Sequence, residues 1–210
     1  MTSTVSRRRK GARTNGSTGT RQAPAPVINK DPAYLVYELL RVLGHDTVRE
    51  GLAKTPERVA RFYRDFLTNR PLFNFTTFDA EGMNEMVVVR QVPFYSLCEH
   101  HLLPFFGTAT VGYVPADRIV GLSKIPRLVQ HLARDLQNQE RLAAQIADKF
   151  GDVLKPKGVG VILHARHLCM EMRGVAIAGA VTTTSALRGV FLDDPRARRE
   201  FLDFDAKNGH

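Results

Sequence analysis

Two short segments of the sequence carry the residues best suited to hold a metal ion. The first, residues 98–101, reads Cys-Glu-His-His, so that Cys98 and His101 stand three residues apart. The second, residues 167–169, reads His-Leu-Cys and ends in Cys169. Thiolate and imidazole are ligands that suit zinc, and a Cys-x-x-His spacing lets one turn or tight loop offer both. The three ligands would leave a fourth position for water, which is typical of catalytic zinc sites.

Two further histidines adjoin this candidate zinc site. His100 precedes one candidate ligand and His167 stands two residues before another, and an imidazole that titrates near neutral pH can transfer protons there. A Cys-x-x-His pair alone is weak evidence, because a buried cysteine usually packs as a small apolar side chain. The metal site is favoured because both cysteines of the chain stand beside histidines, between apolar segments.

Basic side chains near predicted helix starts point to an anionic ligand. Ser123, Lys124 and Arg127 place a hydroxyl and two cations at a strand-to-helix junction, where backbone N–H groups also favour phosphate. Arg173 follows the second cysteine segment, and Arg58 lies near another helix start. Each of these residues taken alone is more often a solvated surface charge.

The dipeptide Gln139-Glu140 has two interpretations. It is an ordinary start of a helix, or its carboxylate accepts hydrogen bonds from N1–H and the 2-amino group of guanine. Guanine is the common base that presents both donors together. Composition does not decide between these two interpretations.

The charge of the chain is concentrated at its N-terminus. The 210 residues have a formal charge of +9, but residues 1–30 contain seven Lys and Arg and no acid. Without these seven, 23 basic residues face 21 acidic ones. A nearly neutral body argues against an extended nucleic-acid surface. The polar tail predicts a disordered, solubilising arm, although its composition also fits a weak nucleic-acid contact or an organellar presequence.

The cysteine count and the apolar pattern indicate where the protein resides. Two cysteines are too few for a disulfide scaffold in a chain of this length, so we expect a reducing, cytoplasmic setting. No segment approaches the roughly 20 apolar residues of a membrane span. We therefore expect no membrane partner.

Helix caps and apolar periodicity predict an α+β fold. Asp31-Pro32 and Thr55-Pro56 are capped helix starts, and the segment 95–106 between two strands is expected to be a connection that carries chemistry. The predicted helices are 32–44, 55–67, 125–136, 140–154 and 195–204, and the predicted strands are 86–92, 108–114, 159–163 and 175–184. The order of helices, strands, helices and strands favours α+β over a doubly wound sheet.

Several longer sequence motifs match those of one known family and occur in the same order. They read C-E-H-H-L-L-P-F, G-L-S-K-I-P-R, Q-E-R-L, H-L-C-M-E-M-R-G-V and V-T-T-T-S-A-L-R-G-V-F, and an earlier T-P-E-R-V-A segment fits as well. Over residues 31–204 the chain thereby resembles GTP cyclohydrolase I. The resemblance leaves out the basic tail.

The resemblance implies a fold, an assembly and a reaction. The fold is the tunnelling fold, an antiparallel sheet backed by helices, in a domain of residues 31–210. Subunits would join their sheets into a homodecamer with active sites at subunit interfaces. The reaction is zinc-dependent hydrolysis of GTP to formate and 7,8-dihydroneopterin triphosphate, the first step toward tetrahydrofolate, pterins or deazaguanine.

Residue roles follow from the matching positions. Cys98, His101 and Cys169 would be the zinc ligands, His167 the acid and base at the purine nitrogen, and His100 its assistant. Glu140 with Gln139 would hold the guanine edge. The ribose and triphosphate would be approached by Ser123, Lys124, Arg127 and Arg173, and by Arg58 from a neighbouring subunit.

One position departs from the family pattern. His164 stands where an acidic residue is expected, which affects the tuning of the metal if that acid orients a ligand or the catalytic histidine.

The alternative function is a zinc-stabilised nucleic-acid-binding protein that uses the basic tail. It would leave His167 and Glu140 without a role, so nucleic acid is an unlikely partner.

Overall fold

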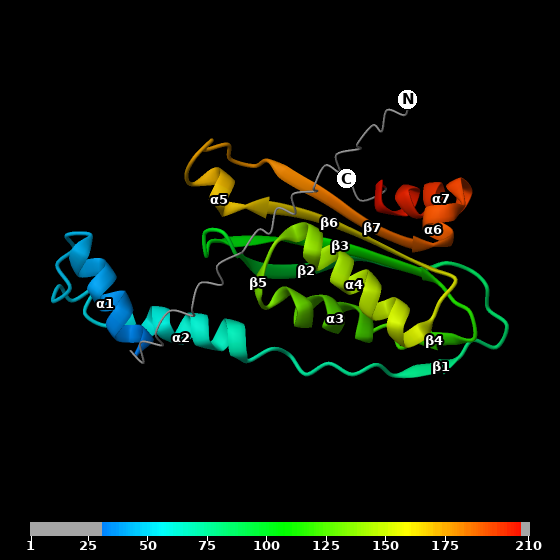
Figure 1. The fold of residues 1–210 in the computed structure, drawn as a ribbon, viewed down its shortest axis with the longest axis horizontal. Coiled ribbons are helices and arrows are strands. Elements are labelled where there is room, and N and C mark those ends of the chain that lie inside the picture. The colour runs from blue at the N-terminus through cyan, green and yellow to red at the C-terminus, as the bar shows by residue number, and fades with distance from the viewer. Residues whose placement is uncertain (1–30, 207–210) are drawn as a thin grey trace, which may run out of the picture.

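The computed structural model describes residues 31–206, so the predicted tail lies outside the described part (Figure 1). The helices are α1 (Pro32–Val42), α2 (Thr55–Thr68), α3 (Lys124–Ala133), α4 (Gln139–Leu154), α5 (Leu168–Glu171), α6 (Val190–Asp193) and α7 (Pro195–Ala206). The strands are β1 (Thr77–Asp79), β2 (Val87–Cys98), β3 (Pro104–Val114), β4 (Arg118–Val120), β5 (Leu136–Gln137), β6 (Gly158–His167) and β7 (Val181–Gly189). Within residues 31–206, none of the helices has the length and apolar character needed to cross a bilayer.

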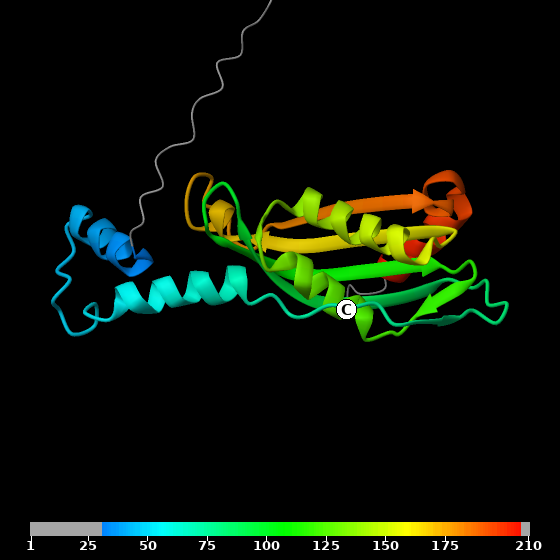
Figure 2. The same cartoon turned by 60° about the horizontal axis from the view of Figure 1, so that its bottom comes forward.

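One five-stranded sheet organises the molecule. Its strand order is β5-β2-β3-β6-β7, and every pairing is antiparallel except that between β5 and β2. A separate two-stranded sheet pairs β1 with β4. Helices α3 and α4 cover one face of the large sheet, and α7 lies on the other (Figures 1 and 2). The predicted α+β fold with an antiparallel sheet backed by helices is confirmed.

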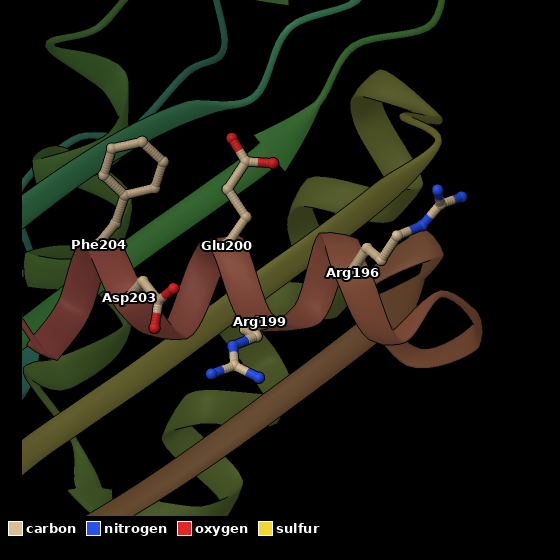
Figure 3. Close-up of a pocket in the computed structure, with 5 residues that line it drawn as sticks. All are labelled: Arg196, Arg199, Glu200, Asp203 and Phe204. Carbon is tan, nitrogen blue, oxygen red and sulfur yellow. The ribbon is translucent and has the colours of Figure 1, made fainter.

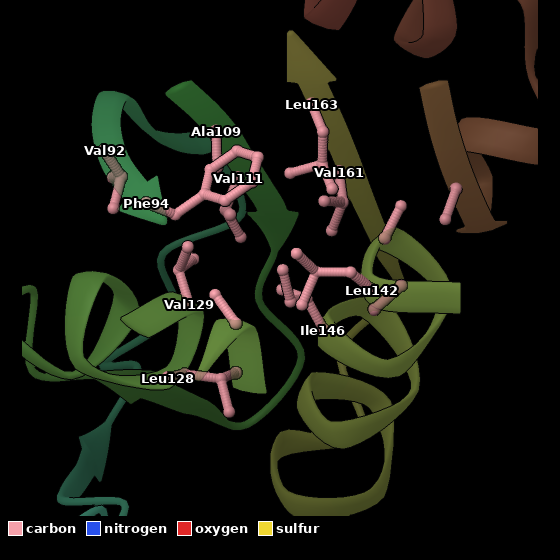
Figure 4. Packing of buried hydrophobic residues seen from close by; sticks show 14 of the residues in the cluster. Val92, Phe94, Ala109, Val111, Leu128, Val129, Leu142, Ile146, Val161 and Leu163 are labelled. Carbon is pink, nitrogen blue, oxygen red and sulfur yellow. The ribbon is translucent and has the colours of Figure 1, made fainter. Parts of the chain in front are cut away.

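The main core lies between the sheet and the two covering helices (Figure 4). In α4, Leu142, Ile146 and Phe150 form an apolar stripe at helical spacing and are fully buried. Its partners on β6 include Val161 and Leu163, which are two residues apart and therefore point to the same face. Burying a side chain of this size contributes about 1.5–3 kcal/mol, so this face fixes how α4 lies on the sheet.

Helix α7 is held on the opposite face by an aromatic ring seated over two glycines. Gly112 of β3 and Gly160 of β6 are paired across the ladder, and the ring of Phe201 is fully buried against them. A methyl group at Gly160 would lie 2.6 Å from Phe201 Cε1, and one at Gly112 would lie 2.7 Å from Cε2. The glycines are therefore required by the close approach of the ring.

Helices α1 and α2 form a hairpin that stands out from the rest of the structure (Figures 1 and 2). The Asp31 carboxylate caps α1 by accepting a hydrogen bond from Ala33 N, as predicted. Thr55 was predicted to be a cap but is the first residue of α2, and its hydroxyl donates to the Gly51 carbonyl. No residue of α1 is buried, and several of its apolar side chains are exposed at the surface.

The predicted connection over residues 95–106 is wrong at both ends. Strands β2 and β3 continue through this segment to Leu97↔Pro104, and only residues 99–103 connect them. The sequence pattern ends early because a β-bulge lies between Val89 and Val92, and it resets the alternation of inward and outward side chains. The extended hairpin places Cys98 at the very end of a strand.

Two other predicted boundaries are also wrong. The predicted strand 175–184 begins at Val181, because Gly174, Ala176 and Gly179 have positive φ and turn the chain before it. The predicted helix 125–136 ends at Ala133, since the next residues pair with β2 as strand β5. At 175–184 an apolar run without periodicity misled the prediction, and at 125–136 the helical spacing of apolar residues continues to Leu136 beyond the end of the helix.

Replacing Gly160 by alanine is expected to destabilise the protein by about 1–3 kcal/mol, because the added methyl group forces Phe201 away from the sheet. The matched control is Gly151→Ala in α4, where a methyl group would meet nothing within 4 Å. Removing a helical glycine there is expected to stabilise by about 0.5–1 kcal/mol. Urea unfolding at one protein concentration measures both. Equal midpoints for the two variants would contradict this account of α7.

Candidate metal and nucleotide site

Strand directions bring the two cysteine segments together. Strands β2 and β6 both pair antiparallel with β3, so their C-terminal ends lie at the same end of the sheet. Cys98 is the last residue of β2, and β6 ends at His167, directly before α5 with Cys169. Helix α4 begins at this end too, because β5 pairs with the last residues of β2. Residues about 70 positions apart in the sequence thus meet.

A cavity of about 230 Å³ lies at this end of the sheet. It collects the candidate ligands, both candidate proton-transfer histidines and the start of α4. Its lining residues are Cys98, His100, His101, Phe105, Gln137, Asn138, Gln139, Glu140, His167, Cys169, Met170 and Thr182.

The side chains of Cys98, His101 and Cys169 could hold one metal ion. One ligand atom from each lies within 4.8 Å of the other two, and Cys98 Sγ is 3.7 Å from His101 Nδ1. Tetrahedral zinc with Zn–S of about 2.3 Å and Zn–N of about 2.0 Å requires a separation of about 3.6 Å between sulfur and nitrogen. The donor set therefore fits zinc. Burial and the neighbouring Cys98 raise the pKa of the Cys169 thiol, and a bound cation would favour its thiolate.

His167 is held in one orientation and one tautomer. Its ring stacks on Phe105, the residue opposite on β3, with centroids 4.8 Å apart. Its Nε2 lies 2.7 Å from Gln139 Oε1. An amide oxygen only accepts, so Nε2 carries the hydrogen and Nδ1 remains for other partners. Burial lowers the pKa of His167, and the charge of Glu140 opposes this shift.

The polar groups of the Gln139 side chain are bonded to other protein atoms. It is 1% exposed, and its Nε2 donates to the carbonyls of Leu163 (3.0 Å) and Thr182 (2.9 Å). These bonds fix which end of the amide is oxygen. Its acceptor is occupied by His167. The expected role of Gln139 at the guanine edge stays a prediction, and the contact gives the residue a second possible role, the positioning of His167.

Three other predicted residues do lie at or beside the cavity. Glu140 lines it and is exposed, next to Gln139 in the first turn of α4. His100 lines it with Nδ1 3.9 Å from Cys98 Sγ. Arg173 lies beside the cavity without lining it, with its Nη1 2.7 Å from Nε2 of His101.

The remaining predicted phosphate contacts are not brought to the cavity of their own chain. Ser123 and Lys124 stand at the start of α3, whose far end leads into β5 beside the cavity. Ten helical residues span about 15 Å, and the Lys124 ammonium donates instead to Asn74. Arg127 is exposed on the next turn, and Arg58 lies in the projecting hairpin. None of these four lines the cavity.

His164 is directed to the opposite face of the sheet from His167. Its Nε2 lies 2.7 Å from Asp205 of α7, and its Nδ1 lies 2.9 Å from the Thr183 hydroxyl. Asp205 also accepts from Thr110 at 2.6 Å. Residues 164 and 167 are separated by an odd number of strand positions, so they point to opposite faces. His164 therefore fastens α7 and makes no contact with the candidate ligands or with His167.

Sequence reasoning missed the polar contacts that surround the cavity. Glu99 and Arg141 form an ion pair of 2.7 Å, and Asn138 caps α4 by accepting from Arg141 N. Hydrogen bonds from Arg141 and then from Asn138 lower the pKa of the Glu99 carboxyl. Asn138 was detectable as a capping residue before a helix. The ion pair had no such signal in the sequence. A charged residue beside a metal ligand, or in the first turn of a helix, is common and does not by itself indicate a partner.

Cavity size alone would have indicated a different place. A cavity of about 460 Å³ lies along α7, as Figure 3 shows, and is lined by Arg196, Arg199, Glu200, Asp203 and Phe204. All five come from one helix, and none is a cysteine or histidine. The smaller cavity is the candidate site because thiols, imidazoles and a carboxylate converge there.

Comparison with known proteins gives one consistent family. The model of the family "GTP cyclohydrolase I" matches residues 33–205. A relative named GTP cyclohydrolase 1, from Campylobacter jejuni subsp. jejuni, is 52% identical over 80% of this chain and 90% of the relative. Another from Synechococcus sp. is 53% identical over 82% of this chain and 78% of the relative. The fold expected from the resemblance is thus the fold of the matched family, and the chain belongs to the GTP cyclohydrolase I family.

Proposed function

We propose that this protein hydrolyses GTP, with bound zinc, to 7,8-dihydroneopterin triphosphate and formate. The observation that carries the proposal is one cavity containing Cys98, His101 and Cys169 together with His167 and Glu140. This set combines a metal site, a proton-transfer group and a carboxylate suited to guanine. Family membership supports the same activity.

Each group of side chains has a distinct task in this reaction. Cys98, His101 and Cys169 hold the zinc. Bound zinc supplies Lewis acidity that can lower the pKa of water to about 7, which makes a nucleophile available at neutral pH for carbon C8 of the purine. The guanine imidazole ring is otherwise a poor electrophile, so a proton must also be delivered to it.

His167 is the group that we assign to this proton. Its Nε2–H is committed to Gln139, so Nδ1 is the atom that accepts the moving proton and returns it. The lowered pKa keeps the ring neutral near pH 7, ready to accept a proton and then return it. His100 assists at the rim of the cavity.

Glu140 is assigned to the guanine edge. A carboxylate can accept from N1–H and from the 2-amino group at once, and no single-donor base satisfies both oxygens. Glu140 stands in the first turn of α4, where the helix dipole favours a negatively charged side chain.

The triphosphate requires cations that one chain does not collect. Arg173 lies beside the cavity, but Ser123, Lys124, Arg127 and Arg58 would have to come from further copies. We therefore include in the proposal a homo-oligomer, a decamer in the form that the resemblance implies, with sites between subunits. A cytoplasmic setting and a place at the start of tetrahydrofolate, pterin or deazaguanine synthesis belong to the same proposal.

The proposal predicts that GTP turnover depends on the metal. Purified protein incubated with GTP is expected to release formate and to give the fluorescence of the oxidised pterin product. A chelator should abolish both signals, and added zinc should restore them, because the nucleophile depends on the metal. A zinc-loaded protein that leaves GTP intact would refute the proposed function.

Substitution of His167 by asparagine is expected to lower kcat by about 10²–10⁴, since a positioned acid or base contributes a factor of that size. Zinc content, measured by metal analysis, should stay near one per chain because His167 is not a ligand. His164→Gln is the matched control, with a histidine from the same strand on the opposite face, and it should retain turnover. Loss of zinc from the His167 variant would argue against the assigned role.

Substitution of Gln139 by methionine separates its two possible roles. If it positions His167, kcat should fall while the KM for GTP changes little. If it held guanine, KM should rise as expected for Glu140→Gln. Loss of the amide also removes its hydrogen bonds to the carbonyls of Leu163 and Thr182, so urea unfolding should register a destabilisation of about 1–3 kcal/mol. A change confined to KM would exclude the positioning role.

A further inference from the structure

The connection that carries two candidate zinc ligands is short and has to be held against the rest of the site. It runs from Cys98 through His101, and Leu102 N donates to Cys98 O at 2.8 Å to close the turn. This bond shapes the turn but does not fix its position relative to α4. The side chains of Glu99 and Arg141 make that second connection.

In the sequence, Glu99 stands between a candidate metal ligand and a residue that lines the cavity. Its own side chain is directed toward α4. Its Oε2 accepts from Arg141 Nη2 at 2.7 Å, and its Oε1 accepts from Asn138 Nδ2 at 3.0 Å. Its backbone N–H donates to Gln137 O at 3.0 Å. Glu99 does not line the cavity. Three hydrogen bonds thus join this one residue to the segment that starts α4.

Arg141 is itself held from the side opposite the metal loop. Its Nε donates to Gln137 Oε1 at 2.9 Å, and its Nη2 also donates to Leu136 O at 2.8 Å. Gln137 is 2% exposed, and its Nε2 donates to Leu132 O and Gln145 Oε1. These contacts fix the orientation of the Gln137 amide. The guanidinium is therefore placed before it meets the loop.

Three consecutive residues of α4 connect the parts of the site. Gln139 contacts His167, Glu140 lines the cavity, and Arg141 contacts the loop of the metal ligands. The helix turn that carries them is fixed by the buried core face of α4. A shared rigid turn keeps the metal, the proton-transfer group and the base-binding carboxylate in one geometry.

We infer that Glu99 and Arg141 are positioning residues, whose contact places the metal ligands relative to Glu140 and His167. The inference rests on the proposed function. The two side chains remain 29% and 40% exposed, and ion pairs of this kind contribute little to global stability. Their effect is therefore on the geometry of the site, where changes to residues that support metal ligands typically weaken metal affinity 10- to 100-fold.

Zinc affinity of the full-length protein tests this inference. We expect Arg141→Met and Glu99→Gln each to bind zinc about 10- to 100-fold more weakly in competition with a chromophoric chelator. The visible absorption of the cobalt(II)-substituted variants should change, and kcat should fall more than the KM for GTP rises. The urea midpoint should stay near that of the unmodified protein. The double variant should be no weaker than the worse single variant, because both changes remove one contact.

A matched control is available in another ion pair that involves α4. Arg188→Met removes the ion pair of 2.9 Å between Arg188 of β7 and Asp148 of α4, at exposed positions away from the cavity. This variant should bind zinc as the unmodified protein does.

Several outcomes would overturn the inference. Unchanged zinc affinity and cobalt absorption in both single variants would do so, as would losses that add in the double variant. If Arg141→Met does not fold, Glu99→Gln decides alone, because it keeps the shape of the side chain while it removes the charge and replaces one of the two accepting oxygens by a donor. An unmodified protein that binds no zinc would contradict the proposed function itself.

Discussion

The register of β6 is the constraint on which the site depends. Its residues alternate between the core under α4, which receives Val161 and Leu163, and the face under α7, which holds Gly160 and His164. A slip by one residue would exchange these two faces. It would move His167 away from the candidate ligands and force a side chain into the place of the glycine under Phe201. The core and the docking of α7 therefore select the same register, and that register delivers His167 to the site.

The start of α4 supplies the side chains that complete the site beside the end of β6. Residues near the end of a sheet are ordinarily mobile, but here a buried helix begins beside the strand ends and contributes three successive side chains in three directions. Two amides, Gln137 and Gln139, have each of their polar groups committed, so their orientation is not free. Such connected networks rigidify a site, because any rearrangement leaves a buried group without its partner. Positioning here is a matter of hydrogen-bond satisfaction more than of charge.

The sequence predicted the features that depend on residue type, and it missed those that depend on where a side chain or a strand is directed. Cys98, His101 and Cys169 were identifiable because thiols are rare in this chain and suit zinc. Helices followed from Asp31 and from the apolar stripe of α4. The role of Gln139 was not accessible, since type and position do not say whether an amide faces a ligand or the protein interior. Strand ends failed for a similar reason, because a bulge and positive-φ turns interrupt the patterns on which strand prediction relies.

The charges and the surface of this chain suggest that its site is incomplete alone. A triphosphate carries about four negative charges, and a cavity with Arg173 as its one cation among the predicted phosphate contacts would bind it weakly. In the same chain α1 buries none of its residues, and Leu39, Val42 and Leu43 are 57%, 75% and 63% exposed. Apolar surface of this kind is characteristic of an interface. An assembly that covered the α1–α2 hairpin would also carry Arg58 of α2 into contact with another copy. In the proposed homo-oligomer, one association of the chain with itself would both cover α1 and supply the missing phosphate ligands.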